Sequence, residues 1–86
     1  MIIIFHNFFR KKLEKLSKKD QVKVGNNLRI FTQDQNISIL NNHALHGKYL
    51  GCRSINISGD LRAIYRMQNN NIAFFIDIDN HANLYK

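Results

Sequence analysis

Histidines, together with nearby basic and acidic residues, are the parts of this chain that could do chemistry. Four histidines occur, at positions 6, 43, 46 and 81. An imidazole pKa of about 6.5 lets either protonation state exist near neutral pH. His43 and His46 lie in one polar segment, and His81 follows the last apolar segment. Charged residues occur in the neighbouring segments, at Arg53, Asp60 and Arg62. Together these side chains could form an acid–base and anion-stabilising group.

Each of these residues also has a structural explanation. Loop histidines such as His43 and His81 can be satisfied by backbone groups, strand arginines can be solvated, and Asp60 beside Gly59 fits turn chemistry. A zinc site would need three or four ligands. The chain has one cysteine, Cys52, and no pair of histidines four residues apart on a helix. We therefore expect no metal and no cofactor.

The first half of the chain is expected to supply a strand and two helices. The segment 2–5 is dominated by β-branched residues, which are typical of a short strand. His6 is expected at the start of a helix as an ordinary surface residue. That helix would carry one apolar stripe, made of Phe5, Phe8, Phe9, Leu13 and Leu16. Ser17, three residues before Asp20, predicts the start of a second helix that ends around 34–36. The second helix would carry Val22, Val24, Leu28 and Phe31.

After position 50 the period of the pattern changes from 3.6 to 2, which indicates strands. Three such segments, 52–58, 61–67 and 72–78, are separated by short turns and predict an antiparallel meander. The third is almost continuously apolar and is expected to be central. The predicted fold class is α+β, with two N-terminal helices packed on a small antiparallel β-sheet. The opposite face of the sheet would be available for a ligand.

The length and charge of the chain restrict its function further. Eighty-six residues correspond to a single domain, 1–86. The formal net charge is +7, and seven of the 13 lysines and arginines lie within residues 10–23. Such a basic segment is either a solvated surface or a site for a polyanion such as nucleic acid. The apolar N-terminus is too short for a signal or membrane-spanning segment, so we expect no membrane partner and a cytoplasmic protein.

Three motifs in the second half resemble the RelE/ParE superfamily of toxins. Residues 43–53 read His-x-Leu-x-Gly-x-x-x-Gly-x-Arg, and residues 59–65 read Gly-Asp-Leu-Arg-x-x-Tyr. Residues 77–85 read Asp-Ile-x-x-His-x-x-Leu-Tyr. Order, spacing and residue types together are most similar to the YafQ branch, the messenger-RNA interferases of type II toxin–antitoxin systems. Residues 1–42 resemble that branch only in their layout of helices.

The resemblance implies a ribosome-dependent endoribonuclease that cleaves messenger RNA without a metal. The implied catalytic residues are His43, Asp60, Arg62, His81 and Tyr85. The residues expected to bind RNA are Lys11, Lys12, Lys15, Lys48 and Arg53. The implied partners are a cognate antitoxin protein, the message and the ribosomal RNA. His43 and His81 would be the base and the acid, in an order that the sequence leaves open.

Two positions depart from the family pattern, and two other functions stay open. Asn56 stands where some YafQ-type toxins have a further histidine, and Asp79-Asn80 replaces the usual Gly-Thr before His81. One alternative is a non-enzymatic inhibitor of DNA gyrase, as in the ParE branch. The other is an inactive protein with the toxin fold that serves only in binding.

Overall fold

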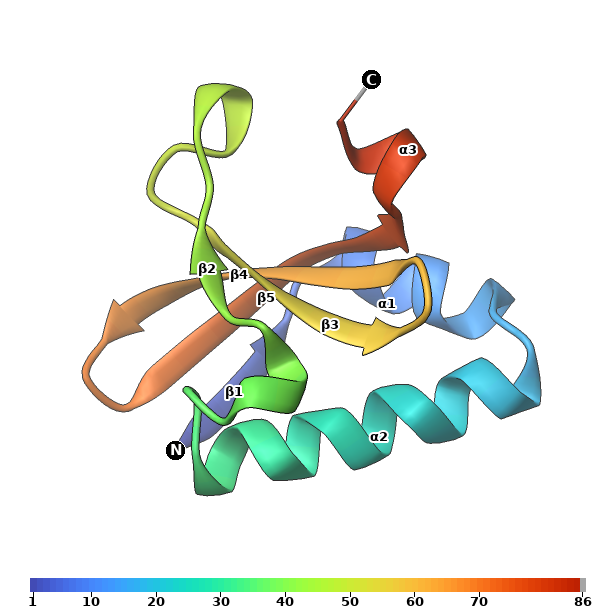
Figure 1. Cartoon of the computed structure of the whole chain (residues 1–86), viewed down its shortest axis with the longest axis horizontal. Helices are drawn as coiled ribbons and strands as arrows, with labels where there is room; N and C mark the ends of the chain where they lie inside the picture. Colours follow the sequence, from blue (N-terminus) through green and yellow to red (C-terminus); the bar gives the residue numbers. More distant parts are fainter. Residues whose placement is uncertain (86) are drawn as a thin grey trace.

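The computed structural model describes residues 1–85. Five strands are present, β1 (Ile2–Phe5), β2 (His43–Ala44), β3 (Arg53–Ser58), β4 (Leu61–Asn69) and β5 (Ile72–Asn80). The three α-helices are α1 (Asn7–Lys15), α2 (Lys18–Gln33) and α3 (His81–Leu84), and short 3₁₀ helices occur at Ser38–Leu40 and Gly47–Tyr49. Figure 1 shows α2 along one face of the sheet, while α3 and the loop between β2 and β3 rise from the other. The predicted α+β class is confirmed.

The sheet is mixed, with the order β1-β5-β4-β3-β2. Strands β2 to β5 pair antiparallel, as expected for a meander, and β5 lies between β4 and β1. Strand β1 differs from the expected antiparallel arrangement because it pairs parallel to β5 over Ile2–Phe5. A strand followed by helices rather than by a tight turn can return to the sheet in either direction. Beyond Phe75, none of the described residues forms a strand beside this edge of β5.

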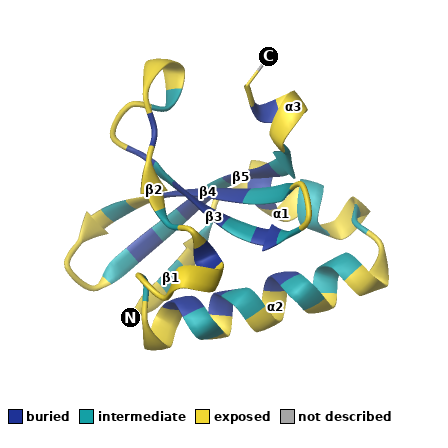
Figure 2. Ribbon diagram, viewed as in Figure 1, coloured by how far each residue is buried: buried dark blue, intermediate teal, exposed yellow. Residues whose placement is uncertain are grey.

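The helix face of the sheet, defined by Ile55, Tyr65 and Phe75, forms the main core. Phe31 of α2 meets the rings of Tyr65 and Phe75 edge to face, at centroid distances of 4.8 and 5.4 Å. Phe9 of α1 packs on the same Phe75 ring at 5.7 Å. Figure 2 shows the buried side of α2 turned toward the sheet and its exposed side turned away. This aromatic cluster fixes both helices on one face.

The predicted helix boundary at Ser17 is confirmed. The Ser17 hydroxyl accepts a hydrogen bond from the backbone N–H of Asp20, and α2 begins at Lys18. His6 precedes α1 and its ring nitrogen accepts from the Phe8 N–H, so it caps the helix. The predicted apolar stripes were wrong at two positions: Phe8 is 49% exposed and Val22 is 62% exposed. A helix turns by about 100° per residue, so Val22 and Val24 cannot both face the sheet.

The loop face of the sheet, defined by Ser54, Ile64 and Asp77, carries a smaller core. Buried Ile64 of β4 is packed with Leu84 of α3 and with two residues that flank the loop, Leu45 and Cys52. Tyr49 and Ile76 pack against this group. The loop between β2 and β3 and helix α3 are therefore both anchored on the face opposite α2.

An ionic cluster docks α1 beside the free edge of β5. Lys12 Nζ lies 2.9 Å from Asp77 Oδ1 and 3.0 Å from Asp79 Oδ2. Partial burial acts to lower the pKa of Lys12, but hydrogen bonds and attraction from the two carboxylates outweigh it and raise that pKa. Burial acts to raise the pKa of Asp79, but hydrogen bonds from the Asn83 side chain, Lys12 and the backbone N–H of Asn80 lower it overall. Folding thus favours the charged forms of both side chains.

We expect this cluster to make the stability of the fold depend on pH at both ends of the range. A lowered carboxyl pKa stabilises the fold above the unfolded value of about 4 and loses that effect as the pH falls through the folded value. A raised lysine pKa stabilises it below about 10.4, an effect lost as the pH rises further. Urea unfolding between pH 3 and 11 should show both declines. Asp79→Asn should weaken the acidic decline, and Lys12→Met should weaken both. An acidic decline unchanged in both variants would contradict this assignment.

Candidate functional site

A hollow of about 340 Å³ lies between the β2–β3 loop and α3. Three of its lining residues are histidines, His43, His46 and His81, and a fourth is Tyr85. All four residues are exposed, in contrast to the buried aromatic cluster of the helix face. Three of the residues expected to be catalytic, His43, His81 and Tyr85, are thus brought together although they come from segments nearly forty positions apart.

The backbone of β2 presents His43 at the edge of the sheet. His43 pairs with Ser54 across β2 and β3, which places it on the loop face. Its Nδ1 lies 2.8 Å from the backbone oxygen of Asn41. Asn41 adopts a left-handed conformation with φ of 45°, which turns the chain just before β2. A carbonyl oxygen can only accept, so Nδ1 carries the proton and Nε2 of the neutral ring holds the free lone pair.

Helix α3 places His81 and Tyr85 one turn apart on the same side. Asn80 is the N-cap of the helix, and its side chain accepts from the N–H of Asn83 at 2.8 Å. Asp79 accepts from the Asn83 side chain at 3.0 Å. Asp79 and Asn80, one of the two departures from the resembled pattern, therefore cap this helix. The rings of His81 and Tyr85 are tilted against each other with centroids 4.7 Å apart.

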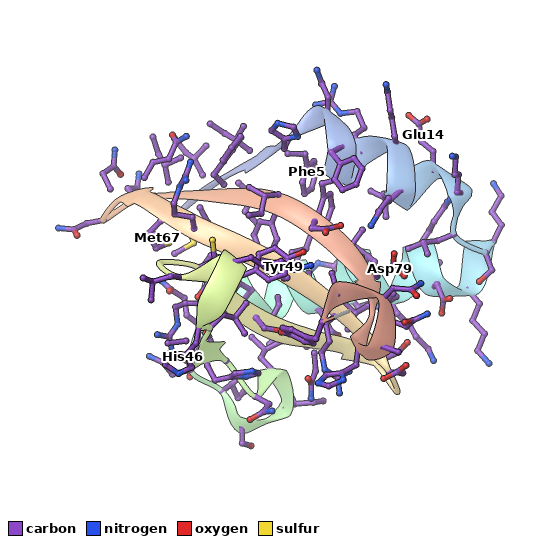
Figure 3. All side chains as sticks on the ribbon, turned by 90° about the horizontal axis from the view of Figure 1, so that it is seen from above. Phe5, Glu14, His46, Tyr49, Met67 and Asp79 are labelled. Carbon is purple, nitrogen blue, oxygen red and sulfur yellow. The ribbon has the colours of Figure 1, made fainter. Side chains whose placement is uncertain are left out.

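Tyr49, in the 3₁₀ helix of the β2–β3 loop, contacts both the sheet and Tyr85. Its hydroxyl donates to Asp77 Oδ2 at 3.1 Å, and its ring meets the Tyr85 ring edge to face at 6.2 Å. Burial, followed by the nearby Asp77 carboxylate, raises the pKa of Tyr49 to about 12. Lys48 Nζ lies 5.2 Å from the centre of the Tyr49 ring. Figure 3 shows Tyr49 over the middle of the sheet, between the loop that carries His46 and the α3 region near Asp79.

Asp60 lies in the β3–β4 turn and Arg62 near the start of β4, and neither lines the hollow. The backbone oxygen of Asp60 accepts from the N–H of His81 at 3.0 Å, so it is the main chain of this residue that holds His81. Arg62 Nη1 donates to the carbonyl oxygens of Gly59 and Leu61 at 2.7 and 3.2 Å. Arg62 pairs with Asp79 across β4 and β5. It lies two positions from Ile64 along β4 and therefore on the same face of the sheet. It shares the loop face with His43, with its guanidinium folded back on its own turn.

Arg53 lies on the helix face and away from the hollow. It pairs with Tyr65, and its Nε donates to the Asn42 side chain at 2.7 Å. Asn42 in turn donates to the Tyr65 hydroxyl at 2.7 Å. Arg53 lines a second hollow of about 380 Å³ around the edge of β2, which also includes His46. The alternation of β3 explains this placement, because neighbours such as Arg53 and Ser54 point to opposite faces.

The three expected RNA-binding lysines of α1 have different surroundings. Lys11 and Lys15 are exposed. Lys12 is half-buried in the cluster with Asp77 and Asp79, and its Nζ lies 4.6 Å from the centre of the Phe8 ring. Sequence periodicity alone did not distinguish Lys12 from its neighbours.

Sequence reasoning did not select two polar features of this region. His46 lines the hollow with His43 and His81, and the signal for it was its position three residues after His43. Ser54 Oγ and Asn56 Oδ1 are buried on the loop face without a hydrogen-bond partner within residues 1–85. Asn56 is opposite Arg62 in the sheet. No three metal-binding side chains converge closely enough within these residues to hold an ion.

Neither the helices nor a search of curated proteins gives a further indication of function. No helix within the described part of the chain is long and apolar enough to cross a membrane. A search of curated proteins found no match.

Solved structures share this fold over nearly the whole chain. The crystal structure of YafQ from Escherichia coli BL21(DE3) matches with a TM-score of 0.82 and 18% identity, covering 98% of this chain and 97% of that one. A chain of the E. coli DinJ–YafQ toxin–antitoxin complex matches with a TM-score of 0.79 and 19% identity, covering 98% of this chain and 96% of that one. The RelBE2 toxin–antitoxin complex of Mycobacterium tuberculosis matches at 0.76 and 17%, over 93% and 96%. At these identities the likeness establishes the fold.

A protein-family model identifies the chain more closely. The model is described as a bacterial toxin of the type II toxin–antitoxin system, YafQ, and it matches residues 1–86. The match includes the first 42 residues, for which the motifs gave only a layout. The chain therefore belongs to the YafQ family of type II toxins.

Proposed function

We propose that this toxin is a ribosome-dependent endoribonuclease that cuts messenger RNA by metal-independent acid–base chemistry. The observation that carries the proposal is the exposed hollow lined by His43, His46, His81 and Tyr85. Its lining contains groups that can give and take protons near neutral pH, and an aromatic ring on which a base could stack. Family membership supports the toxin role.

In the proposed reaction, the phosphorus exchanges its bond to the 5′-oxygen of the next nucleotide for a bond to the neighbouring 2′-oxygen. A base removes the proton of a ribose 2′-hydroxyl, and that oxygen attacks the adjacent phosphorus. The bond from phosphorus to the 5′-oxygen of the next nucleotide breaks, and an acid protonates that oxygen. The products are a 2′,3′-cyclic phosphate and a 5′-hydroxyl end. A cation must stabilise the extra negative charge of the pentacovalent phosphate.

The geometry favours His43 as the base and His81 as the acid. The contact of His43 Nδ1 with the Asn41 carbonyl leaves Nε2 as the atom that can accept the 2′-proton. His81, on the other side of the hollow, would deliver a proton to the 5′-oxygen. Tyr85, which is 38% exposed, would stack on a base. Asp60 is expected to contribute through its carbonyl contact with His81.

Arg62 is proposed to stabilise the phosphate. Within residues 1–85 its hydrogen bonds use only Nη1, so Nε and Nη2 are available to an incoming anion. Arg62 lies on the loop face of the sheet, as His43 does, and this position is compatible with the role. Lys11, Lys15 and Lys48 would attract RNA over a longer range, and Arg53 would contact it at the edge of β2.

The remaining partners follow from the same proposal. A cognate antitoxin would bind and inhibit this toxin, as the DinJ–YafQ and RelBE2 complexes are toxin–antitoxin complexes with the same toxin fold. The message and ribosomal RNA would be the nucleic-acid partners, and the net charge of +7 suits such polyanions. A toxin that acts on translating ribosomes would work in the cytoplasm.

Replacement of the three hollow histidines one at a time should separate their roles. We expect His43→Ala and His81→Ala each to reduce the cleavage rate by about a hundredfold or more, because each removes a proton-transfer group. His46→Gln should change that rate by less than about tenfold, because no base or acid role is assigned to it. The measurement is single-turnover cleavage of message on purified ribosomes.

The folded state of each histidine variant provides the control. Circular dichroism and urea unfolding should match the wild type, since all three side chains are exposed. A cleavage rate unchanged in folded His81→Ala would remove that residue from the mechanism. A larger loss in His46→Gln than in His43→Ala would reverse the assignment of the base.

Charge removal at two places should affect different kinetic constants. The double variant Lys11→Met/Lys15→Met should raise KM and reduce its dependence on salt while kcat changes little, because these side chains bind RNA without touching the reacting atoms. Arg62→Ala should lower kcat by about a hundredfold with a smaller change in KM. Measuring the cleavage rate as a function of message concentration, at two salt concentrations, gives kcat and KM for both variants. A lower kcat in the lysine variant, or a change in KM alone in Arg62→Ala, would contradict the division of roles.

A further inference from the structure

Tyr49 lies between the buried part of the sheet and two residues that line the hollow, His81 at the start of α3 and Tyr85 just after its end. Its hydroxyl contacts Asp77, and its ring contacts the Tyr85 ring. Tyr85 in turn contacts the His81 ring at 4.7 Å. A continuous series of side-chain contacts therefore runs from a buried carboxylate to an exposed histidine.

Asp77 is a fixed anchor at the inner end of this series. It is 8% exposed and accepts from Lys12 Nζ at 2.9 Å, from the Tyr49 hydroxyl at 3.1 Å and from the N–H of Ile78 at 2.8 Å. A buried carboxylate is stable only while such partners are in place. Its oxygens therefore hold the Tyr49 hydroxyl at a defined point above the sheet.

Helix α3 needs support from outside because it is a single turn. A helix of four residues is not stable by its own hydrogen bonds. The Asn80 cap and buried Leu84 fix its backbone on the sheet. Those contacts do not fix the rings of His81 and Tyr85, whereas the Tyr49 and Tyr85 rings are nearly perpendicular, with centroids 6.2 Å apart.

We propose that Tyr49 is a positioning residue of the ribonuclease site, held by Asp77 and Lys12, and that it sets the orientation of Tyr85 and His81. The inference rests on the proposed function and adds to it three residues that the hollow itself does not contain. Lys48, whose ammonium lies over the Tyr49 ring, is oriented by the same side chain. In this way α1 contributes to the site through Lys12, from the far side of β5.

The hydroxyl of Tyr49 is engaged with Asp77 and does not act as a proton donor to RNA. Burial and the Asp77 carboxylate keep its pKa at about 12, so it stays protonated throughout the working range. The role of this side chain is therefore geometric. Loss of the hydroxyl should loosen the ring without removing a reacting group.

The test is Tyr49→Phe, examined with and without RNA. In the free protein, NMR should show weaker contacts between the His81 and Tyr85 rings and a smaller ring-current shift of the His81 signals. On ribosomes, kcat should fall by about tenfold with little change in KM, because misplacement of a catalytic group slows chemistry more than binding. Lys12→Met should reproduce both effects, and Lys12→Arg should restore them toward wild type.

Tyr65→Phe is the matched control for the NMR experiment. It also removes one hydroxyl hydrogen bond, the one that the Tyr65 hydroxyl accepts from Asn42, but on the helix face. The His81 signals should remain as in the wild type. The proposal is overturned if Tyr49→Phe leaves the His81 signals and kcat unchanged, or if Tyr65→Phe alters the His81 signals equally. If the wild-type toxin cuts no message, the proposed function fails, and the NMR comparison still decides whether Tyr49 positions His81.

Discussion

The carboxylate of Asp77 joins three segments that are far apart in the sequence. Lys12 reaches it from α1, Tyr49 from the β2–β3 loop, and Asp77 itself lies in β5. Because the carboxylate is buried, loss of Lys12 would leave its charge without a counter-ion, and loss of the Tyr49 hydroxyl would remove one of its hydrogen bonds. The docking of α1, the seating of the loop and the support of α3 therefore depend on one another.

This constraint explains how a chain of 86 residues can hold both a core and a site. The helix face is filled by aromatic rings and contains most of the buried apolar residues. The loop face has only a small apolar cluster, with Leu84 beneath α3 and Leu45 beneath the loop. Polar contacts, rather than a second large core, position the loop and α3 on either side of the hollow: Tyr49 donates to Asp77, and His81 donates to Asp60. The basic residues divide in the same way, because Lys12 is structural whereas Lys11 and Lys15 are exposed.

Much of the fold could be predicted from local patterns. The alternation of β3 separates Ser54 and Asn56 from Ile55 and Ile57, and Ser17 marks the start of α2. Such features depend on neighbouring residues and are visible in the sequence. The motifs also gave His43, His81 and Tyr85, which the structure brings to one hollow.

The remaining features depend on contacts between distant segments. Nothing local distinguishes Lys12 from Lys11, because its partners are 65 and 67 positions away. The parallel pairing of β1 depends on the route of two helices, and the contact of Arg53 with Asn42 depends on where β2 lies beside β3. His46 was visible only as a neighbour of His43, and its place in the hollow follows from the path of the loop.

The chemical ends of the cut message test the central claim most directly. Purified toxin would be added to ribosomes paused on a defined message, and both new termini would be identified by mass spectrometry. Attack by the 2′-hydroxyl predicts a 2′,3′-cyclic phosphate, or the 3′-phosphate formed from it, together with a 5′-hydroxyl. A 5′-phosphate and a 3′-hydroxyl, or an intact message, would contradict the account.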